Sequence, residues 1–241
     1  MHQICVFGDS VAKGIVFDDL RHHYSLLKEN CMALAQKELQ IPIRNFASFG
    51  ATITKGKKIL ERKFSQLENC DYTLLEFGGN DCNLNWKEIS DSPLSEHDAE
   101  TPLQTFRKTY EVLIEKTYES GSQPILLTLP PLDSERFFQW VSQGLNKENI
   151  LHFLGNDINS IEEWHSFYND MIYSLANQYK LPIIDIRQSF LDDKNYSRFL
   201  CSDGMHPNAQ GHRLIADTLI DNLKSLLEKR KISCSFVKTA I

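Results

Sequence analysis

The sequence predicts an α/β protein in which a five-stranded parallel sheet lies between two layers of helices. The main observation is alternation: a strand-like apolar run is followed by a helix-like stretch, and this order occurs five times. Alternation of this kind is typical of parallel sheets, because a crossover helix connects each strand to the next. The 241 residues contain no repeat, low-complexity tract or linker, so we expect one domain over residues 1–241.

The predicted strands are short runs of β-branched, aromatic and other apolar residues between turn residues. They cover residues 4–7, 42–47, 72–77, 124–129 and 181–186. The predicted helices cover residues 24–39, a stretch from Ile59 to Leu67, a stretch that starts at Thr101, residues 161–179 and residues 207–229. Thr101 and Gln104 have the spacing of a capping box, and Pro207 is placed to open the last helix.

Three other segments have no clear periodicity, and we expect them to be loops. Residues 11–21 form a short polar connection, whereas residues 82–100 and 130–160 are long. The tail beyond residue 229 could add an edge strand. Long loops are commonly binding loops, and the aromatic residues of these two could wall a substrate pocket: Trp86, Phe137, Phe138 and Trp140. Packing under the loops or in a subunit contact is an equally good interpretation of these aromatics.

Composition excludes several classes of function. A net charge of −6 argues against a surface for nucleic acid or an anionic membrane. No apolar run approaches the ~18 residues of a transmembrane helix, and no secretory signal is visible. We therefore expect a cytoplasmic protein with no membrane span, and homo-oligomerisation stays open.

The cysteines and histidines form no pattern of metal ligands. The six cysteines include no CxxC pair and are expected to be free thiols: Cys5, Cys31, Cys70, Cys82, Cys201 and Cys234. No spaced set of ligands accompanies the histidines, so neither a metal nor a cofactor is expected.

Chemically useful residues stand where the predicted strands end. Ser10 follows the first strand, where it is either a helix cap or a nucleophile. A serine nucleophile needs a general base, and the base needs a carboxylate partner. Near the other end of the chain, Asp203 and His206 stand three residues apart and supply both.

Two further positions could complete a site for acyl transfer. Gly50 follows the second strand and Asn80 the third, and carboxyl ends of parallel strands share one edge of the sheet. An oxyanion hole needs donors there: the backbone N–H groups of Ser10 and Gly50 and the amide of Asn80 could serve. Each of these residues is also an ordinary turn residue.

These residues lie in four blocks that resemble the SGNH hydrolases, the group that includes the GDSL lipases and esterases. The blocks are FGDS (7–10), NFASFGAT (45–52), GGND (78–81) and DGMHP (203–207), in the order of that family. The resemblance implies that Ser10 is the nucleophile, His206 the base and Asp203 its orienting carboxylate. It also implies an oxyanion hole from Ser10, Gly50 and Asn80, and a flavodoxin-like sheet order of 2-1-3-4-5.

The function that these residues predict is hydrolysis of a small-molecule ester. Two alternatives stay open: a flavodoxin-like phosphate-binding protein, and a binding module that has the fold without the chemistry. The loop after Ile89 is acidic and carries few long apolar side chains, so a shallow site is expected. A short acyl group such as acetyl on a sugar or other polar alcohol is therefore predicted, with lipase, lysophospholipase or thioesterase activity as the alternative.

Overall fold

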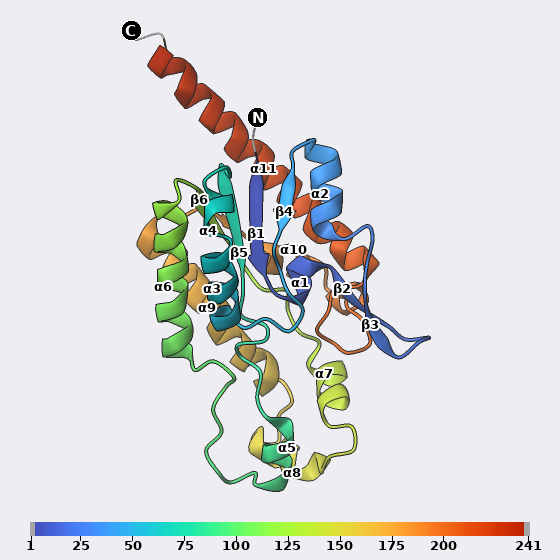
Figure 1. The fold of residues 1–241 in the computed structure, drawn as a ribbon. Coiled ribbons are helices and arrows are strands. Elements are labelled where there is room, and N and C mark those ends of the chain that lie inside the picture. Colours follow the sequence, from blue (N-terminus) through green and yellow to red (C-terminus); the bar gives the residue numbers. More distant parts are fainter. Residues whose placement is uncertain (1–2, 239–241) are drawn as a thin grey trace.

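A parallel five-stranded sheet forms the centre of the molecule in this computed structural model, which describes residues 3–238, with side chains through residue 228. Its strands are β1 (Ile4–Gly8), β4 (Ile43–Asn45), β5 (Tyr72–Glu76), β6 (Gln123–Leu127) and β7 (Ile183–Ile184). Their order in the sheet is β4-β1-β5-β6-β7, and all the pairs are parallel. The predicted fold class and the predicted order 2-1-3-4-5 are confirmed (Figure 1).

Alternate residues of β1 enter two different hydrophobic cores, one on each face of the sheet. Ile4 and Val6 pack with the helices α2 (Cys31–Leu39) and α11 (Ala209–Lys238). Cys5 and Phe7 belong to the second core, on the opposite face. That face is covered by α3 (Ile53–Arg62), α6 (Leu103–Glu119) and α9 (Ser160–Tyr179), as Figure 1 shows. The strand is apolar throughout because both of its faces are buried.

A third hydrophobic core lies beyond the carboxyl ends of the strands, and we call the helices around it the cap. The cap consists of α5 (Trp86–Asp91), α7 (Ser134–Val141) and α8 (Lys147–Phe153), which gather at one end of the sheet in Figure 1. The expectation that residues 82–100 and 130–160 are loops without structure is therefore wrong. Their helices have only six to eight residues, too few for a clear helical period.

The first loop also differs from the expectation. Residues 10–26 form a single helical turn, α1 (Ser10–Lys13), and an antiparallel hairpin of β2 (Ile15–Asp18) and β3 (His23–Leu26). The predicted helix of residues 24–39 therefore begins only at Cys31, where the Asn30 side chain accepts two backbone N–H groups as a cap.

The other elements lie between these. They are α4 (Phe64–Leu67), α10 (Ile186–Leu191) and a 3₁₀ turn (Tyr196–Phe199). The last helix starts at Ala209, two residues after Pro207, and Asn208 caps it through Gln210 and Gly211. Residues 230–238 continue that helix, so the expected edge strand does not form.

The predicted capping box at Thr101 is also wrong. Helix α6 begins after Pro102 without a side-chain cap, because Thr101 is held at Asp81: its backbone N–H donates to the Asp81 backbone oxygen at 3.0 Å, and its side chain acts to lower the pKa of the Asp81 carboxyl. A partner distant in the sequence thus replaces the local one.

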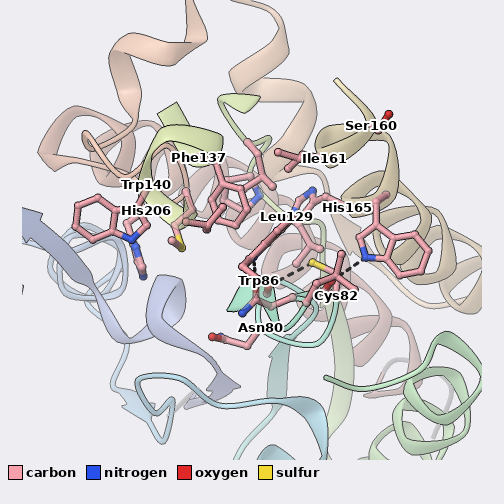
Figure 2. Close-up of a pocket in the computed structure, with 18 of the residues that line it drawn as sticks. Asn80, Cys82, Trp86, Leu129, Phe137, Trp140, Ser160, Ile161, His165 and His206 are labelled. Atoms are coloured by element: carbon pink, nitrogen blue, oxygen red, sulfur yellow. Dashed lines mark hydrogen bonds between the residues drawn. The ribbon is translucent and has the colours of Figure 1, made fainter. Parts of the chain in front are cut away.

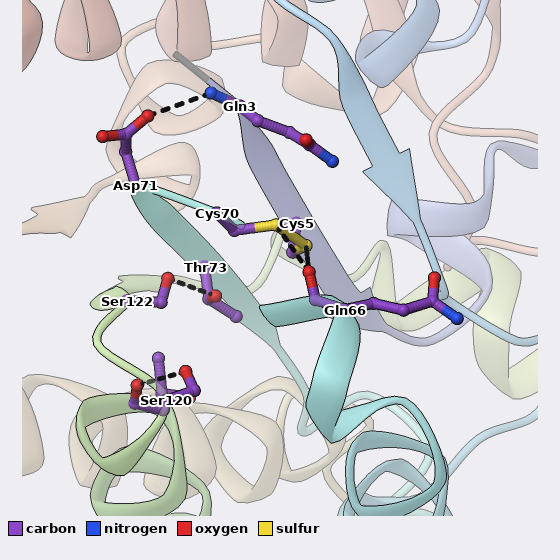
Figure 3. Close-up of a disulfide and its surroundings, with 9 residues drawn as sticks. Gln3, Cys5, Gln66, Cys70, Asp71, Thr73, Ser120 and Ser122 are labelled. Carbon is purple, nitrogen blue, oxygen red and sulfur yellow. Dashed lines mark hydrogen bonds between the residues drawn. A yellow bond between two sulfur atoms is a disulfide. The ribbon is translucent and has the colours of Figure 1, made fainter. Parts of the chain in front are cut away.

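Two of the six cysteines are not free thiols. Cys5 of β1 and Cys70, which precedes β5, form a disulfide across 65 residues of sequence (Figure 3). Cys31, Cys82 and Cys201 are free and buried, and the side chain of Cys234 lies outside the described residues. The expectation of free thiols at Cys5 and Cys70 is corrected, because these cysteines lie on adjacent strand segments that only the folded sheet brings together. Within the described residues, no helix is long and apolar enough to span a membrane.

Gly56 of α3 provides a test of this packing. A Cβ atom at this position would lie 2.2 Å from Cζ of the buried Phe77 ring. Glycine to alanine inside a helix usually stabilises by about 1 kcal/mol. Here we expect Gly56→Ala to lower the free energy of unfolding by about 1–3 kcal/mol because the core is overpacked. Urea unfolding measures the change, with the exposed Thr54→Ala in the same helix as the control. Stabilisation by Gly56→Ala would contradict the close contact.

Candidate active site

Ser10 lies at the carboxyl end of β1, in a turn with very little space. A Cβ atom on Gly8 would lie 2.7 Å from the Ala12 Cβ and 2.8 Å from the backbone oxygen of Glu76, so only glycine fits there. Asp9 then caps α1 by accepting the Val11 N–H at 2.8 Å. This cap places Ser10 at the first position of the helix. Among the described residues, no acceptor binds the backbone N–H of Ser10.

The structure brings Ser10, His206 and Asp203 into one chain of hydrogen bonds, although 196 residues separate the first two. The Ser10 Oγ lies 2.9 Å from His206 Nε2, and His206 Nδ1 lies 2.7 Å from Asp203 Oδ2. The second oxygen of Asp203 accepts the N–H groups of Met205 and His206, both at 3.0 Å. All three side chains are buried.

The charge of Asp203 is stabilised inside this loop. Burial of the carboxyl raises its pKa, but the hydrogen bond and charge of His206 and the two backbone N–H groups lower it more. The net effect is a pKa below the ordinary value, so Asp203 is an anion at neutral pH. It can therefore hold the imidazole in one tautomer and stabilise an imidazolium.

The hairpin of β2 and β3 covers this pair from one side, a feature that the sequence analysis missed. Tyr24 lies 5.0 Å from His206 between ring centroids. Burial, and then the charge and hydrogen bond of Asp203, raise the pKa of its hydroxyl. Phe17 packs edge-to-face on Trp140 of α7 with centroids 4.6 Å apart. The aromatic rings limit the access of water to the histidine and its carboxylate.

The segments around Gly50 and Asn80 meet the end of β1, as the strand order requires. The Ser48 N–H donates to the Gly8 oxygen at 3.0 Å, and Gly50 follows in an exposed turn with φ of 63°. The Asn80 amide donates to Asp9 Oδ2 at 3.0 Å and to the Ala51 oxygen at 3.3 Å. Both amide hydrogens therefore have partners, and an oxyanion would have to share one of them.

Glu76 lies beneath the turn that carries Ser10 and was also missed by the sequence analysis. Its Oε2 accepts the N–H of Asp9 at 3.2 Å and of Ala12 at 3.3 Å. Burial, followed by the charge of Asp9, raises the pKa of Glu76 well above its usual value, and burial also raises that of Asp9. Two adjacent buried carboxyls favour sharing one proton. The position of Glu76 shortly before Gly78 was visible in the sequence, but the burial of its side chain was not.

A cavity of about 640 Å³ opens from these residues toward the cap. Ser10, Asn80 and His206 lie at its wall together with mostly apolar side chains, and Gly50 is not among the lining residues. Three of the four predicted aromatics line it: Trp86, Phe137 and Trp140. Phe138 does not; it packs into the core of the cap. Residues of the cap helices form part of the cavity wall (Figure 2), and the expectation of a shallow site stays a prediction.

The described residues contain no group of three or more histidines, cysteines and carboxylates that could hold a metal ion. This arrangement can activate a hydroxyl, because the Ser10 side chain lies against an imidazole that is held by a carboxylate.

The strand order and the helices on both faces of the sheet are those of the SGNH hydrolase fold. A lipase/acylhydrolase from Enterococcus faecalis shares this fold at 20% identity, with a TM-score of 0.66 over 93% of this chain and 96% of its own. An acetylxylan esterase from Geobacillus stearothermophilus does so at 17% identity and a TM-score of 0.63, over 92% and 93%.

The chain belongs to the GDSL-like lipase/acylhydrolase family, whose model matches residues 6–214. It is also 23% identical over 224 residues to the uncharacterized lipoprotein YqeF of Bacillus subtilis. The matched region covers 90% of this chain and 79% of YqeF. The expected cytoplasmic location stays a prediction.

Asp81, next to Asn80, makes stability depend on pH. Its carboxylate accepts the Ile53 N–H at the start of α3, at 2.9 and 3.1 Å. Burial is the largest effect on this group and raises its pKa from 3.8 to about 7. Between the lower pKa of Asp81 in the unfolded chain and its pKa of about 7 in the native state, the native state holds a proton that the unfolded chain has released. The contribution of protonated Asp81 to stability therefore falls as the pH rises toward 7.

The prediction concerns the difference between the free energy of unfolding of the wild type and that of Asp81→Asn. We expect this difference to fall by about 2–3 kcal/mol from pH 5 to pH 7, because a pKa difference of one unit corresponds to ~1.4 kcal/mol. Urea unfolding at both pH values measures it. The exposed Asp91→Asn serves as the control and should show no such fall. A difference that rises with pH would mean that Asp81 is ionised when folded.

Proposed function

We propose that this protein is a serine ester hydrolase in which Ser10, His206 and Asp203 act as a catalytic triad. The observation that carries the proposal is the continuous hydrogen-bonded chain from Ser10 Oγ through His206 to Asp203. A free hydroxyl is a weak nucleophile at neutral pH, and a neutral imidazole in contact with it can remove its proton.

In the first half of the reaction, Ser10 Oγ attacks the ester carbonyl carbon while His206 Nε2 takes the hydroxyl proton. The carbonyl oxygen becomes an oxyanion. When the tetrahedral intermediate collapses, the bond to the alcohol breaks and His206 returns the proton to the alcohol oxygen. Asp203 stabilises the imidazolium in between.

In the second half, a water molecule attacks the acyl group on Ser10. His206 takes a proton from the water and then gives it to the Ser10 oxygen as the carboxylic acid leaves. After the first half Ser10 carries the acyl group in place of its proton, and after the second half all three side chains are back in their starting protonation states.

The proposed oxyanion hole consists of the N–H groups of Ser10 and Gly50 and the Asn80 amide. The Ser10 N–H supports this role most directly, since it is unpaired among the described residues and starts a helix. Asn80 would turn one amide hydrogen from the Ala51 oxygen toward the substrate. Its remaining bond to Asp9 keeps the amide in place.

The two alternatives have less support. A phosphate at the end of β1 would meet the carboxyl groups of Asp9 and Glu76, which repel an anion when charged. A binding module without catalytic chemistry does not require the hydrogen bond between His206 and Ser10.

The cavity bears on which esters are substrates. It is large and apolar, with Leu129 and Ile161 far along the wall from His206 in Figure 2. An acetyl group would leave most of it empty. We infer that it takes an acyl chain of more than four carbon atoms, which is the lipase-like alternative and not the predicted acetyl preference.

Ser10 can be tested directly as the nucleophile. A serine-directed phosphonate should label the protein once, and Ser10→Ala should abolish labelling and lower kcat by about 10⁴-fold or more, because the attacking oxygen is lost. Intact-mass measurement and hydrolysis of p-nitrophenyl esters provide the readouts. Ser160 also lines the cavity but bonds to the Leu154 oxygen, so Ser160→Ala is the matched control. Labelling of Ser10→Ala at wild-type rates would remove Ser10 from this role.

Chain length tests the acyl assignment. With p-nitrophenyl esters we expect kcat/KM to rise from acetyl to hexanoyl by up to about fourfold per CH₂, since each buried CH₂ contributes ~0.8 kcal/mol. Ile161→Phe, which fills part of the cavity, should remove the advantage of the longer esters. Leu94→Phe changes an 86% exposed side chain and should not. Fastest hydrolysis of acetyl esters with a steady fall thereafter would instead support the short-acyl prediction.

A further inference from the structure

His165 of α9 is a polar side chain in the apolar wall of the cavity. It is 3% exposed and lines the cavity near Leu129 and Ile161, as Figure 2 shows. It makes no contact with the Ser10, His206 and Asp203 chain, so the proposed mechanism gives it no role.

The surroundings of His165 determine which ring nitrogen carries the hydrogen. Arg187 Nη1 lies 3.4 Å from His165 Nδ1. A guanidinium can only donate, so Nδ1 must accept and the ring hydrogen is on Nε2. The Glu162 carboxylate is 3.8 Å from Nδ1, too far for a hydrogen bond. Burial lowers the pKa of His165 to about 4, which keeps the ring neutral at neutral pH.

The group that orients His165 is itself firmly held. Arg187 forms an ion pair with Glu162, and its backbone N–H donates to the Thr128 hydroxyl at 2.9 Å. Glu162 also accepts the Leu132 N–H at 2.9 Å. The charge of Arg187 is thus balanced before any substrate enters, and no lysine or arginine lines the cavity among the described residues. A bound anion would find no counter-charge there.

The Nε2–H of His165 has no hydrogen-bond partner among the described residues. A plain alkyl chain that fills the cavity would displace water from this donor and leave it unpaired, which costs about 1–3 kcal/mol. A substrate oxygen at this point would restore the hydrogen bond.

We propose that His165 determines specificity by donating its Nε2–H to a neutral oxygen in the acyl chain, so that the preferred substrates are esters of hydroxy-, oxo- or ether-containing acids. The proposal rests on the proposed ester hydrolysis and names its substrate class. It differs from a merely apolar acyl pocket, which would prefer plain alkyl chains at every position.

A series of p-nitrophenyl esters of one chain length tests this, with a single CH₂ replaced by an ether oxygen at each successive position. One position should give a kcat/KM about five- to tenfold above that of the all-carbon ester, corresponding to one hydrogen bond. At the other positions the oxygen should lower kcat/KM, because it is desolvated without a partner.

Variants assign the effect to His165. In His165→Leu the ratio of the preferred ether ester to the all-carbon ester should fall to 1 or below. In His165→Gln the ratio should be retained in part, since an amide can accept from Arg187 and still donate. His97→Phe is the matched control: His97 lines the cavity too, but its ring bonds to the Ser92 oxygen, so its loss should leave the ratio unchanged.

Two outcomes would overturn the proposal: an all-carbon ester preferred at every position by the wild type, or an ether preference that persists in His165→Leu. The ratio is measured within one protein, so partial loss of folding in a variant does not affect it. Hydrolysis of every ester without an oxygen preference would refute only this proposal. Absence of all hydrolysis by the wild type would refute the proposed function.

Discussion

The parallel pairing of β1 with β5 is the constraint on which the site depends. Its register sets Gly8 opposite Glu76, at the carboxyl ends of both strands. Glu76 can then accept the N–H groups of Asp9 and Ala12, which lie on either side of Ser10. Asp9 in turn binds the Asn80 amide. A shift of one residue would turn every side chain of the strand to the other face and break all of these contacts.

The same arrangement has an energetic cost. Asp9, Glu76 and Asp81 are buried within one small region, and burial raises the pKa of all three. One oxygen of Glu76 is buried without a hydrogen-bond partner among the described residues. Such groups destabilise a fold, yet here they hold the backbone around Ser10. The hydrophobic cores on both faces of the sheet offset that cost, as expected when a functional site is less stable than its scaffold.

The sheet and the cap have separate tasks. The carboxyl ends of the strands hold Ser10 and Asn80, and helices α5, α7 and α8 surround the space beyond them. The hairpin of β2 and β3 closes the side next to His206 through Tyr24. In the proposed function, the end of the sheet would provide the geometry for ester chemistry, and the segments inserted after strand ends would determine which molecules reach it.

The sequence by itself determined the parallel sheet, the strands to within two residues at each end, and the positions of Ser10, Asn80, Asp203 and His206 after the strands or before the last helix. Strand and helix periods are local properties of the chain, and parallel strands present their carboxyl ends on one edge. Only the tertiary structure decided what depends on distant partners. In the folded molecule Cys5 pairs with Cys70, and Thr101 lies at Asp81. Phe137 lines the cavity, whereas Phe138 packs in the core of the cap. The rotation of a short helix and the burial of His165 depend on packing across the whole molecule, for which neighbouring residues in the sequence carry no signal.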